Sequence, residues 1–196
     1  MEKLLVEVLC PGSCVRLINC NGDEVSLEAI AKRVGTLARL EQKRFSPIIV
    51  LLDREGRAAE SSKIKRELLA LLRQENVAVP VIVGVPDRMI ENWILADIET
   101  VARFIQIKRK PSAQPFEGTA GEARLKELLP ETFTYVKTIH GVEWFKSCDS
   151  ETIGQNSASF REFVSALADL KCKWLAQKRL PLNYSDPIKT KESGLE

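Results

Sequence analysis

Acidic residues follow two apolar runs of this chain, and carboxylates in that position can bind a metal ion. Asp53 and Glu55 come at the end of the run PIIVLLD, and Asp87 and Glu91 follow the next run, VPVIVGVP. Mg2+ takes hard oxygen ligands, commonly one or two carboxylates together with waters. The four acids therefore predict a divalent-metal site. The competing interpretation is that Asp53 caps the next turn and Glu55 is solvated.

Glu91 is the acid that is hardest to explain without a partner. Its sequence neighbours include Met89, Ile90 and Trp93, and a carboxylate among so many apolar side chains needs a cation or a hydrogen-bond donor. Asp87 lies one helical turn earlier, so both acids can face the same edge of the structure. A helix N-terminus, which favours acids through its dipole, is a sufficient explanation for Asp87 but less so for Glu91.

The elements that must position these acids alternate between helix and strand. Apolar residues recur at helical spacing in residues 26–45, with Ser26 as a candidate N-cap, and again in residues 61–77. The two apolar runs that precede the acids are typical of strands covered on both faces in a parallel sheet. This order predicts an α/β fold with a parallel sheet and helices on both faces. It places the acids at the carboxyl edge, where open parallel sheets bind ligands.

The remaining segments extend this pattern in both directions. A further helix is expected over residues 88–105, then a loop rich in Pro, Gly, Ser and Ala over residues 106–122, and a short helix in ARLKELLP. FTYVKTIHG is either extended or helical, and a helix capped by Ser157 or Ser159 closes the fold. At the start of the chain, MEKLLVEVLCPG has helical spacing and CVRLINC is typical of a short strand.

Length and composition indicate one domain, residues 1–180, followed by a flexible tail, residues 181–196, within the 196 residues. The composition is 44% hydrophobic and 29% charged, and no apolar run approaches the ~20 residues that a bilayer span needs, so no membrane contact is expected. The N-terminus lacks the features of a signal peptide. The five cysteines have no zinc-site spacing and indicate reduced thiols in a cytoplasmic protein. Nothing around any cysteine supports a catalytic pair with His140, the single histidine.

A short basic run lies inside the predicted loop, at Lys108, Arg109 and Lys110. The formal net charge of +2 neither requires nor excludes a nucleic acid as partner. Basic runs of this kind are most often solvated faces. The alternative is that these three side chains contact nucleic-acid phosphates.

Several short segments follow one another in an informative order. IIVLLDREGR is followed by a helix, a strand and PDRMIENWILAD, and later by a Tyr-x-Lys segment, Tyr135 to Lys137, and the helix start SASFREF. This order resembles the toprim superfamily. It is most similar to the small toprim-like proteins related to OLD-family nucleases, which are often found beside ATPases in bacterial phage-defence loci. The resemblance covers roughly residues 1–170 and implies a toprim-like, Rossmann-like sandwich.

The resemblance also implies an activity, a cofactor and partners. The expected protein is a nuclease that cleaves phosphodiester bonds in DNA or RNA with Mg2+ or Mn2+, together with an ATPase partner in phage defence. Carried over by position, Asp53 and Glu55 would be metal ligands, and Glu91 would be a ligand and catalytic acid. Lys137 would stabilise the charge that develops on the phosphate. Asp97 would have a structural role as a cap or ion-pair partner.

One departure from the toprim pattern supports a second interpretation. Toprim proteins begin with a strand that ends in a Glu. The early candidates here are Glu2 and Glu7, and Glu7 lies too close to CVRLINC for a parallel crossover. The alternative function is therefore a non-catalytic relative that acts as a binding or regulatory subunit. A third interpretation is a hydrolase of a nucleotide or small phosphoester that uses the same carboxylates. A sheet edge without its first strand also favours a homodimer that covers it.

Overall fold

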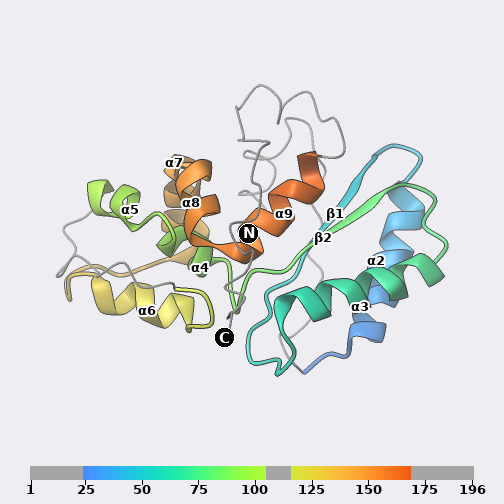
Figure 1. The fold of residues 1–196 in the computed structure, drawn as a ribbon, viewed down its shortest axis with the longest axis horizontal. Helices are drawn as coiled ribbons and strands as arrows, with labels where there is room; N and C mark the ends of the chain where they lie inside the picture. The colour runs from blue at the N-terminus through green and yellow to red at the C-terminus, as the bar shows by residue number, and fades with distance from the viewer. Residues whose placement is uncertain (1–23, 105–115, 169–196) are drawn as a thin grey trace, which may run out of the picture.

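The computed structural model describes residues 24–104 and 116–168 (Figure 1). Four predicted features lie outside these residues: the helix at the start of the chain, the strand CVRLINC, the basic run Lys108–Lys110 and the tail 181–196. Within the described residues the chain has a mixed α/β architecture dominated by helices. None of the described helices is both long enough and apolar enough to cross a bilayer.

Two strands form a parallel sheet in the described part of the chain. β1 (Ile48–Leu51) pairs with β2 (Val81–Gly84), and the register opposes Ile48 to Val81 and Leu51 to Gly84. The connection between the strands contains α3 (Ser61–Gln74). The prediction of two neighbouring parallel strands joined through a helix is confirmed. The carboxyl ends of both strands consequently lie at the same edge of the sheet.

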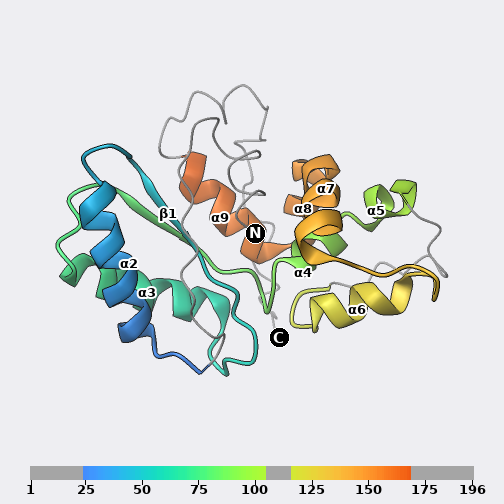
Figure 2. The same cartoon turned by 180° about the vertical axis from the view of Figure 1, so that it is seen from behind.

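Helices cover both faces of this sheet (Figure 1, Figure 2). Side chains of a strand alternate between its two faces. Val83 and Val85 accordingly pack in a core with α2 (Leu27–Glu41) and α3, whereas Ile82 packs in a core with α9 (Ala158–Ala168). The sheet therefore lies between α2 and α3 on one face and α9 on the other.

Where β2 ends, α9 approaches the sheet closely. A Cβ added to Gly84 would lie 2.4 Å from Cδ2 of Leu51 and 2.6 Å from Cδ2 of Phe163. Both distances are well inside van der Waals contact, so glycine is needed for this approach. The ring of Phe163 also stacks on Trp93 with centroids 5.5 Å apart, which fastens α9 to the segment that carries Glu91.

Capping explains where two of the predicted helices begin. The hydroxyl oxygen of Ser26 accepts the N–H of Ala29 at 3.2 Å, so Ser26 is the N-cap of α2 as predicted. The hydroxyl oxygen of Ser157 accepts the N–H of Phe160 at 3.2 Å. Of the two predicted caps for α9, Ser157 is therefore the one that satisfies its first turn.

The expectation of one continuous helix over residues 88–105 is wrong. The segment forms two shorter helices, α4 (Glu91–Leu95) and α5 (Ile98–Phe104). The chain turns at Asp97, whose Oδ1 accepts the N–H of Thr100 at 3.3 Å, and a side chain that bonds the backbone in this way competes with a continuing helix. The predicted structural role of Asp97 is confirmed.

β1 is less enclosed than its apolar sequence predicts. All four of its residues are half-buried, whereas three of the four residues of β2 are buried. Among the described residues β1 pairs only with β2, so one edge of β1 lacks a strand neighbour there. The expectation of a strand covered on both faces holds better for β2 than for β1.

Short helices surround the segment that contains Lys137. The expected loop ends before residue 122, because α6 begins at Gly121. FTYVKTIHG turns out to be both extended and helical, since Val136 is extended and a single π-helical turn, η1, begins at Lys137. The elements of this part are α6 (Gly121–Leu128), η1 (Lys137–Gly141), α7 (Val142–Ser147) and α8 (Ser150–Asn156).

Candidate functional site

The loops that follow β1 and β2 meet at the carboxyl edge of the sheet. The N–H of Ile90 donates to Oδ1 of Asp53 at 3.1 Å. The N–H of Glu55 donates to the carbonyl oxygen of Arg88 at 2.6 Å. These bonds join one loop to the other, so the prediction that Asp53 and the segment around Glu91 share an edge is confirmed.

Glu91 is fully buried, and two side chains from a distant segment bind its carboxylate. The hydroxyl of Tyr135 donates to Oε1 at 3.2 Å, and Nζ of Lys137 donates to Oε2 at 3.1 Å. The prediction that this carboxylate needs a cation or a donor is confirmed. Gly141, the last residue of η1, makes room for the phenol, because a Cβ there would lie 2.7 Å from the Tyr135 hydroxyl oxygen.

Lys137 reaches Asp53 as well as Glu91. Its Nζ lies 3.6 Å from Oδ2 of Asp53 and 3.1 Å from Oε2 of Glu91. Each carboxylate thus has one oxygen held by a protein donor, the Ile90 N–H or the Tyr135 hydroxyl, and turns its other oxygen to the same ammonium. Asp53, Glu91 and Lys137 are called the carboxylate–lysine cluster below. The two carboxylates thus share one ammonium.

Burial dominates the electrostatics of the cluster, and the Lys137 ammonium offsets its effect on Asp53 only in part. Burial raises the pKa of Asp53 to about 6. Lys137 opposes this rise, whereas Glu91 and Glu55 add to it. Burial alone would lower the pKa of Lys137, but Asp53 and Glu91 outweigh it and the pKa is raised. Burial, followed by the charge of Glu91, also raises the pKa of Tyr135, so the phenol keeps its proton and remains a donor.

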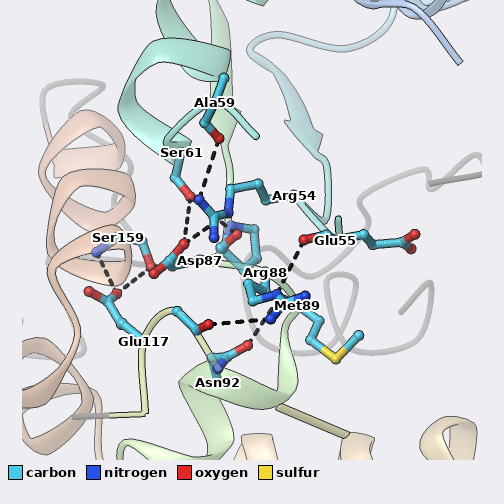
Figure 3. Close-up of polar contacts among 12 residues, drawn as sticks. Arg54, Glu55, Ala59, Ser61, Asp87, Arg88, Met89, Asn92, Glu117 and Ser159 are labelled. Atoms are coloured by element: carbon cyan, nitrogen blue, oxygen red, sulfur yellow. Dashed lines mark hydrogen bonds and ion pairs between the residues drawn. The ribbon is translucent and has the colours of Figure 1, made fainter. Parts of the chain in front are cut away.

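Glu55 lies near the cluster on an unusual backbone. Its φ is 51°, and φ of Arg88 on the facing loop is 73°. Residues other than glycine seldom adopt the left-handed region, and such conformations are concentrated at functional sites. The Glu55 side chain points away from the ion pair of Arg54 and Asp87 (Figure 3). Its charge still contributes to the raised pKa of Asp53.

Asp87 does not join Glu91, contrary to the expectation that both acids face one site. Nε of Arg54 lies 3.0 Å from Oδ1 of Asp87, and the Ser61 hydroxyl donates to the same oxygen at 3.5 Å (Figure 3). The reason is that α4 begins only at Glu91, so Asp87 precedes the helix and is not one turn along it. In the part of the chain that the structure describes, no three Asp, Glu, His or Cys side chains are arranged to hold a metal.

A polar contact that sequence reasoning missed fastens the start of α9 to these loops. The hydroxyl oxygen of Ser159 accepts the indole N–H of Trp93 at 2.9 Å and the N–H of Asp87 at 3.3 Å. The same hydroxyl donates to Oε1 of Glu117 at 2.6 Å (Figure 3). The Ser157 hydroxyl donates to that oxygen too, also at 2.6 Å. The pattern SASFREF predicts that both serines lie at the start of a helix. No local pattern points to Glu117, which lies in a segment expected to be a loop.

The predicted site residues therefore have three outcomes. The structure brings Asp53, Glu91 and Lys137 together in one cluster. It places Glu55 close enough to act on the charge of Asp53. The basic run 108–110 lies outside the described residues.

A family model spans all of the described elements. The model, described as a domain of unknown function (DUF4276), matches residues 1–168. The chain belongs to the DUF4276 family. No curated protein and no solved structure matches it. The DUF4276 match includes every member of the carboxylate–lysine cluster, and its description states no activity.

Proposed function

We propose that this DUF4276 protein is a divalent-metal-dependent nuclease of toprim type that cleaves phosphodiester bonds in DNA or RNA. The observation that carries the proposal is a pair of carboxylates, Asp53 and Glu91, that each turn one oxygen to a single cation position. This position lies at the carboxyl edge of parallel strands, where α/β sheets bind ligands. A buried, charged cluster at such an edge is a candidate for chemistry rather than for stability alone.

The donor set fits a hard divalent cation. Oδ2 of Asp53 and Oε2 of Glu91 face a position that already holds the positive charge of Lys137. Mg2+ and Mn2+ prefer carboxylate oxygens. A divalent charge would offset the burial and the neighbouring carboxylates that raise the pKa of Asp53 to about 6. Asp53 and Glu91 would hold the ion together with waters, and Glu55, on the same loop as Asp53, would have to turn its side chain to become a further ligand. When bound, such an ion supplies an activated water and stabilises the leaving oxygen.

The other residues of the site would bind the phosphate or orient the carboxylates. Lys137 is 33% exposed, so its ammonium can extend from the cluster towards solvent and contact a phosphate oxygen, where it would stabilise developing negative charge. The Ile90 N–H and the Tyr135 hydroxyl keep the two carboxylates in fixed orientations. They are positioning groups, because they act on the reacting atoms only through Asp53 and Glu91.

The partners in this proposal come from the toprim resemblance. Lys108, Arg109 and Lys110 would contact the phosphates of DNA or RNA, and such contacts weaken as the salt concentration rises. An ATPase partner, a role in phage defence, a homodimer and a cytoplasmic location complete the proposal. Each of them can be tested separately from the chemistry of the cluster.

One observation favours a second candidate function, a non-catalytic toprim relative that acts as a binding or regulatory subunit. Lys137 forms ion pairs with both carboxylates, and two enclosed carboxylates that share one ammonium can serve structure alone. Among residues 24–104 and 116–168, no third acid completes a metal-holding group. Under this candidate function, Asp53 and Glu91 would anchor η1 to the sheet and would bind no metal.

A nuclease assay separates these functions. Wild type and Asp53→Ala would be incubated with single- and double-stranded DNA and RNA in Mg2+, in Mn2+ and in EDTA. We expect metal-dependent cleavage by wild type and its loss in Asp53→Ala. Asp149→Ala is a matched control, because the carboxylate of Asp149 caps α8 by accepting the N–H and hydroxyl of Thr152.

Two results would contradict the proposed nuclease. Metal-dependent cleavage that survives in Asp53→Ala would show that the active site lies elsewhere. A wild-type protein that cleaves none of these substrates and binds neither metal would favour the non-catalytic candidate.

A further inference from the structure

We propose that Lys137 is a built-in counter-ion of the metal position and that a divalent cation must displace its ammonium in order to bind. This inference rests on the proposed function, because it concerns the ion that Asp53 and Glu91 would hold. Nζ of Lys137 lies 3.6 Å from one carboxylate and 3.1 Å from the other. A divalent ion coordinated by the same two oxygens would repel an ammonium at that distance, so the two cations exclude each other.

The carboxylates keep their orientation when the ammonium leaves. Oδ1 of Asp53 accepts the Ile90 N–H at 3.1 Å, and Oε1 of Glu91 accepts the Tyr135 hydroxyl at 3.2 Å. Neither bond involves Lys137. Glu91 is also fully buried, which limits its movement. Displacement of the ammonium therefore exposes a ready pair of oxygens, Oδ2 and Oε2, to the incoming ion.

Lys137 is the member of the cluster that can move. Its side chain is 33% exposed, compared with 12% for Asp53 and 0% for Glu91. A lysine ammonium sits on a flexible four-carbon stem, so it can leave one contact and reach another without backbone movement. Lys137 is also the first residue of η1 and follows the exposed, extended Val136. Once displaced, the ammonium is free to contact an anion on the solvent side.

Displacement would couple metal binding to the contact between Lys137 and a phosphate. Without a divalent ion, Lys137 is bound to the carboxylates and is a poor partner for a phosphate. With a divalent ion in place, the same ammonium becomes available to a phosphate of the nucleic acid. Metal binding would thereby prepare the phosphate contact, and a site without metal would keep part of its negative charge neutralised by Lys137.

The competition predicts an unusual effect of removing the lysine. Lys137→Met keeps an apolar stem of similar length and deletes the competing charge. We expect Mn2+ to bind Lys137→Met at least about tenfold more tightly than wild type, because a direct charge–charge contact in a partly buried site exceeds the free energy of a tenfold change in affinity. A lysine that contacts only the substrate phosphate would leave Mn2+ affinity unchanged.

The test is a measurement of Mn2+ affinity by titration calorimetry and by electron paramagnetic resonance of free Mn2+. Wild type, Lys137→Met and Lys137→Arg would be compared, with Asp53→Ala as the control for the site. We expect tighter binding in Lys137→Met, near-wild-type affinity in Lys137→Arg and loss of binding in Asp53→Ala. Thermal unfolding with and without Mn2+ gives a second readout, since a ligand of the native state raises Tm. If Lys137→Met fails to fold, the neutral and hydrogen-bonding Lys137→Gln takes its place.

The outcomes separate this inference from the nuclease proposal. Mn2+ that binds the neutral variant, Lys137→Met or Lys137→Gln, but not wild type supports displacement, because the lysine then outcompetes the ion. Mn2+ that binds wild type and the neutral variant equally, or binds the neutral variant more weakly, overturns the inference and leaves the nuclease proposal intact. Absence of binding to both proteins also overturns the inference, and the cleavage assay then decides the proposed function independently.

Discussion

Asp53 should lower the stability of the folded protein at neutral pH. Its pKa in the folded protein is about 6, compared with 3.8 for an unperturbed group, chiefly because of burial. Between about pH 4 and pH 6, Asp53 therefore keeps its proton in the folded state, whereas the same group in the unfolded chain has lost it. Stability falls as pH rises through this window. The difference of about 2 pH units corresponds to about 3 kcal/mol of lost stability above pH 6, at 1.36 kcal/mol per unit.

Asp53→Asn removes the titrating carboxyl and keeps its shape. The amide oxygen of Asn can still accept the N–H of Ile90, and the attraction between Asp53 and Lys137 is already included in the raised pKa. We therefore expect Asp53→Asn to be more stable than wild type at pH 7 by up to about 3 kcal/mol, and equally stable near pH 4. A gain in stability on replacing a site residue is typical of functional sites, because residues selected for activity are often not the residues that give the most stable fold.

The assay is urea unfolding followed by tryptophan fluorescence at intervals from pH 4 to pH 8. Asp149→Ala serves as a control of opposite sign. The hydrogen bonds from the Thr152 side chain and backbone lower the pKa of Asp149, so its contribution is present above the unfolded pKa and is lost as pH falls. Parallel curves of stability against pH for wild type and Asp53→Asn would show that Asp53 has no raised pKa, and a less stable Asp53→Asn at pH 7 would show that its charge stabilises the fold.

Two further substitutions probe the packing and hydrogen bonding behind the cluster. Tyr135→Phe leaves Oε1 of the fully buried Glu91 without its phenol donor, so we expect a loss of about 1–3 kcal/mol in urea unfolding, and an unchanged stability would show that another donor replaces it. Gly84→Ala introduces a Cβ 2.6 Å from Phe163 and should destabilise the protein by about 1–3 kcal/mol. Gly154→Ala is its control, because the nearest atom to a Cβ at that helical position is 3.8 Å away and alanine should stabilise α8 by up to about 1 kcal/mol. Equal effects of the two alanines on Tm would contradict the tight packing at Gly84.

Local patterns in the sequence account for the elements that carry the site. Ser26 and the helical spacing that follows it predict α2, and the two apolar runs predict β1 and β2. These signals are reliable because capping and periodicity act over a few residues. The break at Asp97 was not predicted, because a long apolar stretch does not indicate whether a side chain within it will bond the backbone and end the helix.

The sequence alone predicted that Asp53 and Glu91 would lie close together, because consecutive parallel strands bring their carboxyl ends to one edge of a sheet. It also predicted that Glu91 would need a partner, since an isolated carboxylate is unstable among apolar side chains. Which partner each acid takes depends on the tertiary fold. Lys137 is 46 residues from Glu91, and no local pattern couples two positions so far apart. The fold places the ammonium of Lys137, the first residue of η1, between the two carboxylates, while Asp87, which precedes α4, pairs with Arg54.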